Sequence, residues 1–462
     1  MKRQDAYIVL IYYLIVLIIY MEIYEISLYS TPSQSKRPII FIAGLGQSPL
    51  YYKSQSRWRK IWANVDLLYP KQFKRVQLWK KKMQVHYNSM TDEFDSQDIT
   101  AWRDPNYIEN QFVLTNDVGG ISGCCDMTFL SKYTQHDIIK STAGFRLFTD
   151  NLISSGYQVG QTLFGMSYDF RRISGHSYWR EFKKRLKDLI LYAKNQTQQK
   201  VIIITHSLGG ILFNAFCHDE PMSTSICQFV GINTPIGGTL RTIHASLCGS
   251  SFGMNPFGSR KQERWFQDLE SEFSGISLCF PNSKAFHSDY PLIQIEKDKY
   301  NLNDLARLLQ LYCPPVADIY RNNTKPFLDK CTLDAFGTIP TFFIATQSLS
   351  DTFNSEFKIY GEPLFIHYIL DSYNNTYALP NSFASKYKLH QVANEGRNWK
   401  RACCNPSFME SIIPHIGDGT VPLISLCAFD KIHICASPKM DHSTCLMHQE
   451  LYDFISLKTN IF

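Results

Sequence analysis

Short apolar runs without polar interruption alternate with amphipathic segments along much of the chain. The first run is PIIFIAG at residues 38–44, and the second is VIIIT at residues 201–205. Two further strand candidates follow at residues 227–232, where Gln228 interrupts the apolar run, and at residues 341–345. A run of this kind, closed by turn residues, is typical of a strand that is buried on both faces. We therefore predict strands of one buried sheet at these positions.

The segments between these runs carry helical patterns. Apolar residues recur at helical spacing, with Lys and Arg between them, at Trp179, Phe182, Leu186, Leu189, Ile190 and Ala193. A second helix is expected from Leu208 onward. Strands that alternate with helices predict an α/β fold with a doubly wound, mostly parallel sheet. Residues 240–338 break the alternation and are too long for one loop, so we predict an inserted cap subdomain there.

The amino terminus has the pattern of a targeting segment. Lys2 and Arg3 precede an uncharged apolar run over residues 6–21. A basic stretch followed by an apolar stretch is typical of a secretory signal, although no clear small-residue cleavage site follows. We expect residues 1–30 to be a signal peptide or a signal anchor and residues 31–462 to form the folded domain. An anchor would place the remaining chain in the lumen, because the basic flank stays cytosolic.

Composition narrows the class of protein. Hydrophobic residues make up 44% and charged residues 19%, which excludes a disordered or fibrous chain. The net charge of +6 lacks the concentrated excess of Lys and Arg that is typical of a nucleic-acid-binding protein. The 13 cysteines favour an oxidising compartment, and they include no CxxC pair of the zinc-binding type. Sequons at Asn195, Asn322 and Asn374 agree with passage through the lumen. We expect a location in the secretory pathway: anchored in the endoplasmic reticulum membrane, lysosomal or secreted.

A candidate nucleophile lies between a predicted strand and a predicted helix. Residues 205–209, THSLG, differ from the G-x-S-x-G motif only at the first position. In that motif a tight strand-to-helix turn lifts the serine hydroxyl out of the sheet. A Ser-x-Gly turn also occurs without catalysis, but the strand–turn–helix context favours Ser207 as a nucleophile. The backbone N–H groups of Leu208 and Leu45 are the candidates for an oxyanion hole.

A serine nucleophile of this kind needs an acid and a base, which follow it in the order Asp, His. Asp418 lies in the glycine-flanked turn HIGDGTVP, which otherwise would be an ordinary Asp-Gly turn. His442 lies just before a predicted final helix over residues 445–455. We expect His442 to accept the Ser207 proton and Asp418 to fix the tautomer of His442. His448, expected within the final helix, and His433, in the strand-like KIHIC, are alternative bases.

These motifs, taken in order, resemble the lecithin:cholesterol acyltransferase family, which includes lysosomal phospholipase A and phospholipid:diacylglycerol acyltransferases. The similar segments begin with the first strand and its loop (38–46), a tryptophan-bearing lid segment (61–70) and a Y-D-F-R stretch (165–172). The nucleophile motif (206–209), the turn into the cap (233–238), the acid motif (417–421) and the terminal histidine (441–442) follow. The resemblance implies an α/β-hydrolase fold with a lid region over about residues 47–82 and a Ser-Asp-His triad.

The lid region departs from the family pattern. The family's disulfide around the tryptophan segment has no counterpart, since residues 54–57 and 76–80 contain no cysteine. The resemblance implies that Trp58 and Trp62 contact substrate or lipid, but both would equally fill a core. Residues 71–82 interleave Lys and Arg with apolar residues, as expected for a membrane contact or for a solvated helix.

The turn into the cap also departs from the family. Thr234 and Ile236 stand where the family has Ala and Trp. This change affects the expected preference for acyl chain and acceptor, and it leaves the expected chemistry in place.

The resemblance implies a lipid O-acyltransferase that works without a metal or organic cofactor. It would take a fatty acyl group from a phospholipid onto Ser207, and pass it to a sterol, a diacylglycerol or another hydroxyl at a membrane or lipoprotein surface. With water as acceptor, the same mechanism is that of a phospholipase A. A catalytically dead hydrolase fold that binds lipid is an alternative of another class, which the complete Ser, Asp, His order disfavours. A generic carboxylesterase is disfavoured by the lid-like segment.

Overall fold

The computed structural model describes most of the predicted folded domain. The described residues are 36–54, 57–62, 79–96, 99–101, 144–248, 269–286, 288, 292–295, 298–348, 409–411, 418, 420–426, 428–429, 432–437, 440–442 and 444–461. The chain divides into Met1–Arg37 and Pro38–Phe462, and all helices and strands named below belong to the second unit. The predicted signal segment and Asn374 lie outside the described residues. Within those residues, each helix is too short or too polar to cross a membrane.

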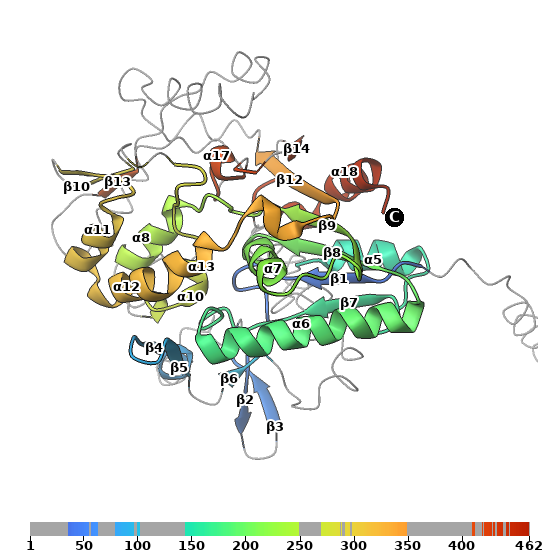
Figure 1. The fold of residues 1–462 in the computed structure, drawn as a ribbon, viewed down its shortest axis with the longest axis horizontal. Helices are drawn as coiled ribbons and strands as arrows, with labels where there is room; N and C mark the ends of the chain where they lie inside the picture. The colour runs from blue at the N-terminus through green and yellow to red at the C-terminus, as the bar shows by residue number, and fades with distance from the viewer. Residues whose placement is uncertain are drawn as a thin grey trace, which may run out of the picture. The chain divides into compact units, whose positions relative to one another are not determined.

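Six parallel strands form the main sheet in the described part of the chain (Figure 1). In spatial order they are β14 (Ile432–Ser437), β12 (Thr341–Ser348), β9 (Ile226–Ile232), β8 (Val201–His206), β1 (Ile39–Ile42) and β7 (Leu163–Met166). Every neighbouring pair is parallel. All residues of β1 and β8 are buried, as their apolar runs predict. The predicted α/β class with a parallel sheet is confirmed.

Helices cover both faces of this sheet. Helices α6 (His176–Thr197) and α7 (Leu208–Asp219) pack in one hydrophobic cluster with Ile40 and Ile42 of β1. Helices α5 (Arg146–Ser154) and α18 (Gln449–Thr459) pack in a second cluster with Ile39 and Phe41 of the same strand. Alternate residues of a strand point to opposite faces, so one apolar run supplies both cores.

The order of the strands distinguishes the carboxyl ends of β1 and β8 from the rest of the sheet edge. The chain passes from β1 to β7 on one side, and then returns to β8 on the other side of β1. The direction of winding therefore reverses between β1 and β8. Ligands of open α/β sheets bind at such a reversal, outside the carboxyl ends of the strands. The loop after β1 and the turn after β8 meet there.

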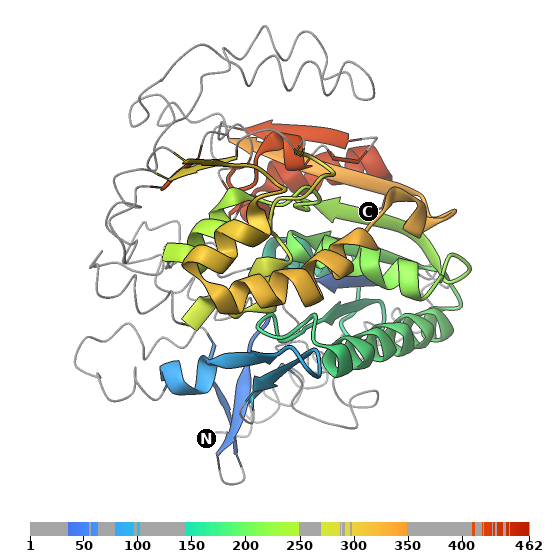
Figure 2. The same ribbon diagram turned by 60° about the vertical axis from the view of Figure 1, so that its left-hand side comes forward.

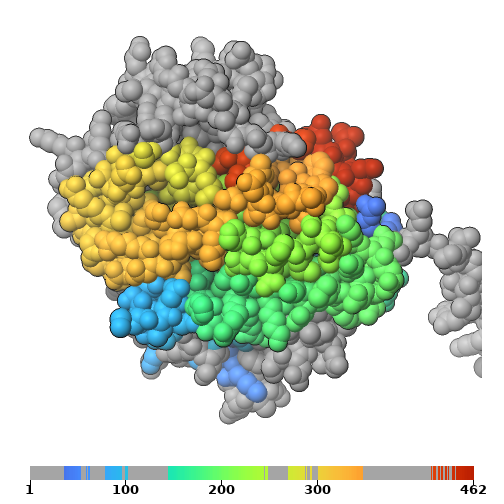
Figure 3. Space-filling model, viewed as in Figure 1, coloured from blue at the N-terminus to red at the C-terminus, as the bar shows by residue number. Residues whose placement is uncertain are grey.

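Residues 240–338, predicted as an inserted cap, follow β9 in the chain, and more than half of those that the structure describes are helical. Their elements are α8 (Leu240–Cys248), α10 (Ser274–Ser277), β10 (Ile293–Ile295), β11 (Asp298–Tyr300), α11 (Leu305–Tyr312), α12 (Pro314–Ile319), the π-helical η4 (Tyr320–Thr324), α13 (Lys325–Asp329) and η5 (Leu333–Phe336). They gather beside the sheet, in yellow and orange (Figure 2). In the space-filling view their surface adjoins that of α6 and α7 (Figure 3). Their apolar residues join the core that α6 and α7 share with the sheet.

Short antiparallel strands occupy the region before α5. Strands β2 (Tyr51–Ser54), β3 (Arg57–Lys60) and β6 (Ile99–Thr100) form one small sheet. Strands β4 (Val85–Asn88) and β5 (Glu93–Ser96) form a hairpin. Outside this region, β13 (Met409–Ser411) pairs with β10. The predicted lid region, residues 47–82, thus contains β2 and β3 among its described residues.

The end of the chain differs from the prediction. Residues Cys445–Met447 form the 3-10 turn η7, and His448 has an extended backbone with φ −104° and ψ 124°. The α-helix α18 begins only at Gln449. The expected helix over residues 445–455 is therefore wrong at its start, because extended backbone at His448 interrupts the helical hydrogen-bond pattern. His448 precedes the first turn of α18 instead of lying within the helix.

Candidate active site

Ser207 lies on a strained turn between β8 and α7. Its backbone has φ 52° and ψ −127°, a conformation that side-chain-bearing residues rarely adopt. Two residues later, a Cβ at Gly209 would lie 2.6 Å from the carbonyl oxygens of Ile42 and Ala43. The first turn of α7 therefore approaches the end of β1 as closely as a glycine permits.

Gly209→Ala is expected to lower the free energy of unfolding by about 1–3 kcal/mol, the usual cost of overpacking. The added methyl group would meet backbone oxygens, which cannot move aside as a flexible side chain can. Urea unfolding of the purified variant measures the effect. Gly-to-Ala exchange in an unstrained helix ordinarily stabilises, so an unchanged or higher midpoint would contradict this packing.

The three residues predicted as nucleophile, base and acid lie in one chain of hydrogen bonds. The Ser207 hydroxyl is 2.8 Å from Nε2 of His442, and Nδ1 of His442 is 2.5 Å from Oδ2 of Asp418. The other carboxylate oxygen, Oδ1, accepts the backbone N–H groups of Thr420 at 3.0 Å and Val421 at 2.8 Å. The carboxylate requires the proton of His442 on Nδ1, which leaves Nε2 to accept from the serine hydroxyl.

Burial protects this arrangement from competing water. Asp418 is fully buried, and Ser207 and His442 are 6% and 9% exposed. The backbone N–H of His442 also donates to the Asp418 carbonyl at 2.6 Å, which fixes the two loops to each other. A carboxylate held in this way orients the imidazole and stabilises the imidazolium that forms on proton transfer.

The alternative bases lie in other surroundings. Nδ1 of His448 is 3.9 Å from Oε2 of Glu450, which belongs to the first turn of α18. His433 lies on β14, with its ring stacked on Phe342 at a centroid distance of 5.9 Å. The geometry thus brings His442, and neither of these two residues, to Ser207.

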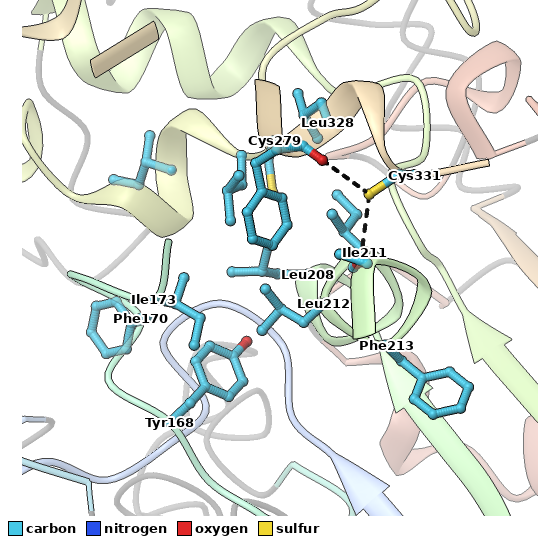
Figure 4. Close-up of a cluster of buried hydrophobic side chains, with 14 of the residues drawn as sticks. Tyr168, Phe170, Ile173, Leu208, Ile211, Leu212, Phe213, Cys279, Leu328 and Cys331 are labelled. Atoms are coloured by element: carbon cyan, nitrogen blue, oxygen red, sulfur yellow. Dashed lines mark hydrogen bonds between the residues drawn. The ribbon is translucent and has the colours of Figure 1, made fainter. Parts of the chain in front are cut away.

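The loop after β1 lies directly beside the nucleophile. A Cβ at Gly44 would lie 3.0 Å from Cβ of Ser207. A Cβ at Gly275, in α10, would lie 2.9 Å from Cδ1 of Leu45 and 3.1 Å from Cδ2 of Leu208. The two residues predicted to supply oxyanion donors are therefore neighbours beneath one short cap helix, and Figure 4 shows Leu208 within the apolar cluster there.

Trp62 supports this loop from its other side. The indole N–H donates to the Gly46 carbonyl at 2.6 Å, and Gly46 has the positive φ of 72°. The ring stacks on Trp79 and meets the edge of Phe170, with centroids at 6.3 and 5.0 Å. Trp62 is buried, so of the two predicted roles it fills a core here. The side chain of Trp58 lies outside the described residues.

The Y-D-F-R stretch after β7 forms a buried ionic cluster. Arg171 and Asp169 are both fully buried and paired, with Nη2 to Oδ2 at 2.6 Å and Nε to Oδ1 at 2.9 Å. Nη1 of Arg171 donates to the carbonyls of Lys82 at 3.2 Å and Met83 at 3.1 Å. Burial alone would raise the pKa of the Asp169 carboxyl, but the charge of Arg171 lowers it below its usual value. The cluster ties the end of the predicted lid region to the segment that follows β7.

Residues around the triad that sequence reasoning did not single out are Gln47, Asn233 and Cys445. Asn233 directly follows β9, has φ 49° and is fully buried. Its amide nitrogen donates to Thr346 Oγ1 at 2.7 Å and to Cys445 Sγ at 3.3 Å. An Asn that follows a strand and tolerates positive φ is the available sequence signal, although its partners are distant in the chain.

The two described sequons lie on helices. Asn195 is exposed near the end of α6, and Asn322 is exposed in η4. Thr324, the third residue of the second sequon, is buried and donates its hydroxyl to Ser277 Oγ at 2.7 Å. Within the described residues, no cluster of three or more His, Cys, Asp or Glu side chains has the geometry to hold a metal ion.

A parallel sheet with helices on both faces, a strained serine at the end of a central strand and a histidine–aspartate pair on later loops are the features of the α/β-hydrolase fold. Comparison with known families narrows this class. The model of the family "Lecithin:cholesterol acyltransferase" matches residues 58–334. The chain belongs to this family.

Three curated relatives show how far the similarity extends. Phospholipase A(1) LCAT3 of Arabidopsis thaliana is 26% identical over 220 residues, 46% of this chain and 44% of that protein. Lysosomal phospholipase A and acyltransferase of Bos taurus is 24% identical over 302 residues, which cover 60% of this chain and 66% of that protein. Phosphatidylcholine-sterol acyltransferase of Gallus gallus is 26% identical over 189 residues, which cover 37% of this chain and 45% of that protein. The alignments thus span between about half and just under two thirds of each relative.

Solved structures with similar chains are more distant. The Tle4-Tli4 complex matches with a TM-score of 0.43 and 11% identity, covering 92% of this chain and 99% of that chain. Bacillus licheniformis lipase BlEst2 matches with a TM-score of 0.35 and 10% identity, covering 93% and 94%.

Proposed function

We propose that this chain is a lipid O-acyltransferase that moves a fatty acyl group from a phospholipid to a lipid hydroxyl. The observation that carries the proposal is the hydrogen-bonded chain from Ser207 through His442 to Asp418, in a member of this family. Two relatives carry the words "acyltransferase" and "phospholipase" or "phosphatidylcholine" in their names, which supports a phospholipid donor.

The first half of the proposed reaction loads the enzyme. Nε2 of His442 takes the proton as Ser207 Oγ attacks the ester carbonyl, and the N–H groups of Leu45 and Leu208 stabilise the oxyanion. The tetrahedral intermediate then expels the lysophospholipid alkoxide, which takes the proton back from His442. The product of this half is an ester between the fatty acyl group and Ser207.

The second half unloads it. His442 removes the proton of an acceptor hydroxyl, the acceptor oxygen attacks the acyl-enzyme, and Ser207 leaves with the proton from His442. A sterol or diacylglycerol acceptor gives a new lipid ester, whereas water gives a free fatty acid and makes the chain a phospholipase A. The phospholipid donor and the lipid acceptor both reside in a membrane or lipoprotein surface, so we expect the reaction to take place there.

A catalytically dead, lipid-binding hydrolase fold is the competing function. It has no need to keep a strained serine within 2.8 Å of a histidine that a buried carboxylate orients. Strained backbone of this kind persists at sites where it serves a mechanism. The geometry therefore favours the enzyme.

Lipid product analysis tests the proposal. The purified full chain is incubated with phosphatidylcholine vesicles that carry an isotope-labelled acyl chain, with cholesterol, with diacylglycerol or with neither. Mass spectrometry is expected to find lysophosphatidylcholine in all three, with labelled ester where the correct acceptor is present and labelled fatty acid elsewhere. Vesicles left without lysophosphatidylcholine would contradict the proposal.

We also propose that the folded domain lies in the lumen of the secretory pathway, which the apolar amino-terminal run and the sequons support. Expression in a secretory eukaryotic host is expected to give a chain whose mass falls on enzymatic removal of N-glycans. Asn195→Gln should remove one glycan, because Asn195 is exposed at a helix end. An unchanged mass after the same treatment of the wild-type chain would contradict the proposed compartment.

A further inference from the structure

His206 lies between two loops of the active site without belonging to the triad. Its ring is buried, with Nδ1 3.1 Å from Oε1 of Gln47 and Nε2 3.0 Å from the backbone oxygen of His442. The same Gln47 oxygen accepts the backbone N–H of Gly44 at 2.7 Å. One imidazole therefore connects the loop after β1 to the backbone of the base.

The carbonyl of His442 is held from a second direction. The Cys445 thiol donates to it at 3.5 Å, and Asn233 donates to the Cys445 sulfur at 3.3 Å. The rings of His206 and His442 lie 5.0 Å apart, and Phe145 meets the His206 ring edge-on at 6.5 Å. Ser207 directly follows His206 in the chain.

The protons of this cluster can be counted. The Gly44 N–H can only donate, so the Gln47 atom that it contacts is the amide oxygen. Nδ1 of His206 therefore faces an oxygen acceptor, and Nε2 faces the His442 carbonyl oxygen and, at 3.8 Å, the Cys445 sulfur. Burial, with a smaller effect from His442, lowers the pKa of His206 well below its usual value, so the ring is neutral and carries one N–H near neutral pH. That proton serves either the Gln47 oxygen or the His442 carbonyl, and the two contacts can be separated by substitution.

We propose that His206 is a positioning residue, whose Nε2–H holds the backbone of His442 so that Nε2 of His442 reaches Ser207. The inference rests on the proposed function, since it concerns the same reaction. His206 touches no reacting atom. A displacement of the base by about 1 Å costs up to about a hundredfold in rate, so loss of this hydrogen bond should lower kcat and leave KM nearly unchanged.

Three substitutions separate the two contacts. His206→Phe keeps the ring and removes both hydrogen bonds. The amide nitrogen of His206→Gln reaches about as far as Nε2 and can donate to the His442 carbonyl. The shorter amide of His206→Asn reaches about as far as Nδ1 and can donate only toward Gln47. His433→Phe is the matched control, because that ring lies on β14, stacked on Phe342.

The measurement is kcat and KM for lysophosphatidylcholine release from mixed micelles, with thermal unfolding of each variant. His206→Phe and His206→Asn are expected to lose about tenfold to a hundredfold in kcat, with KM within about twofold, whereas His206→Gln and His433→Phe stay within about fivefold of wild type.

Equal kcat for the Gln and Asn variants would overturn the proposal, as would wild-type kcat in His206→Phe. If His206→Phe does not fold, the comparison of Gln with Asn still decides. A wild-type chain that releases no product would instead refute the proposed function, and this inference with it.

Discussion

Ser207→Ala is expected to reduce acyl release from phosphatidylcholine by on the order of 10⁵-fold or more, leaving only the rate that binding and oxyanion donors provide. Without the hydroxyl, His442 has no proton to accept and no acyl-enzyme forms. The measurement is lysophosphatidylcholine production by the purified variant, with circular dichroism to verify the fold.

Ser425→Ala is the matched control for this loss. Ser425 is fully buried near the acid loop, and its hydroxyl has no hydrogen-bond partner among the described residues. Its removal is expected to leave turnover within about threefold of wild type, because deleting a hydroxyl that makes no hydrogen bond leaves no other polar group without its partner. Substantial turnover by Ser207→Ala would assign the nucleophile to another residue.

His442→Ala is expected to lower turnover by several orders of magnitude, on the order of 10⁴-fold or more, while His448→Ala loses about tenfold or less. The reason is reach: Nε2 of His442 lies 2.8 Å from Ser207 Oγ, and Nδ1 lies 2.5 Å from Asp418. A general base must lie within hydrogen-bond distance of the proton that it removes. His448 instead lies beside Glu450.

Both histidine variants are to be measured on one phospholipid substrate at the same enzyme concentration. Thermal unfolding must accompany the rates, because His448 precedes α18 and its loss can weaken the helix start. The reverse ranking, with His448→Ala the slower enzyme, would show that the loop between β14 and α18 adopts another arrangement during catalysis.

The sheet was predictable where a strand is an uninterrupted apolar run. Strands β1, β8, β9 and β12 fall on the predicted runs, because burial on both faces favours apolar residues at most positions. Gln228 of β9 is a buried polar exception, and its amide donates to the Thr459 carbonyl at 3.1 Å. Strand β7 was missed, since its residues, LFGM, include no β-branched side chain, whereas IIFI of β1 has three. The late start of α18 was also missed, because the extended backbone of His448 carries no local sequence mark.

The candidate site was partly predictable for a similar reason. Ser207, Asp418 and His442 each lie in a short local motif, and the three motifs follow the order Ser, Asp, His that is typical of α/β-hydrolase triads. The contact of His206 with Gln47 joins residues 159 positions apart, and that of Asn233 with Cys445 joins residues 212 apart. Such contacts depend on the complete fold, so no local sequence pattern predicts them. Trp62 shows the same limit: its motif allowed a lipid contact or a core, and its hydrogen bond to Gly46 places it in the core.

Labelling with a fluorophosphonate, which reacts with activated serine hydroxyls, tests the central claim most directly. The full chain is treated with the probe, digested and mapped by mass spectrometry. The account predicts a single adduct, on Ser207, that is absent from Ser207→Ala and forms far more slowly in His442→Ala. An unlabelled wild-type chain, or an adduct on another serine, would contradict the claim that Ser207 is the nucleophile.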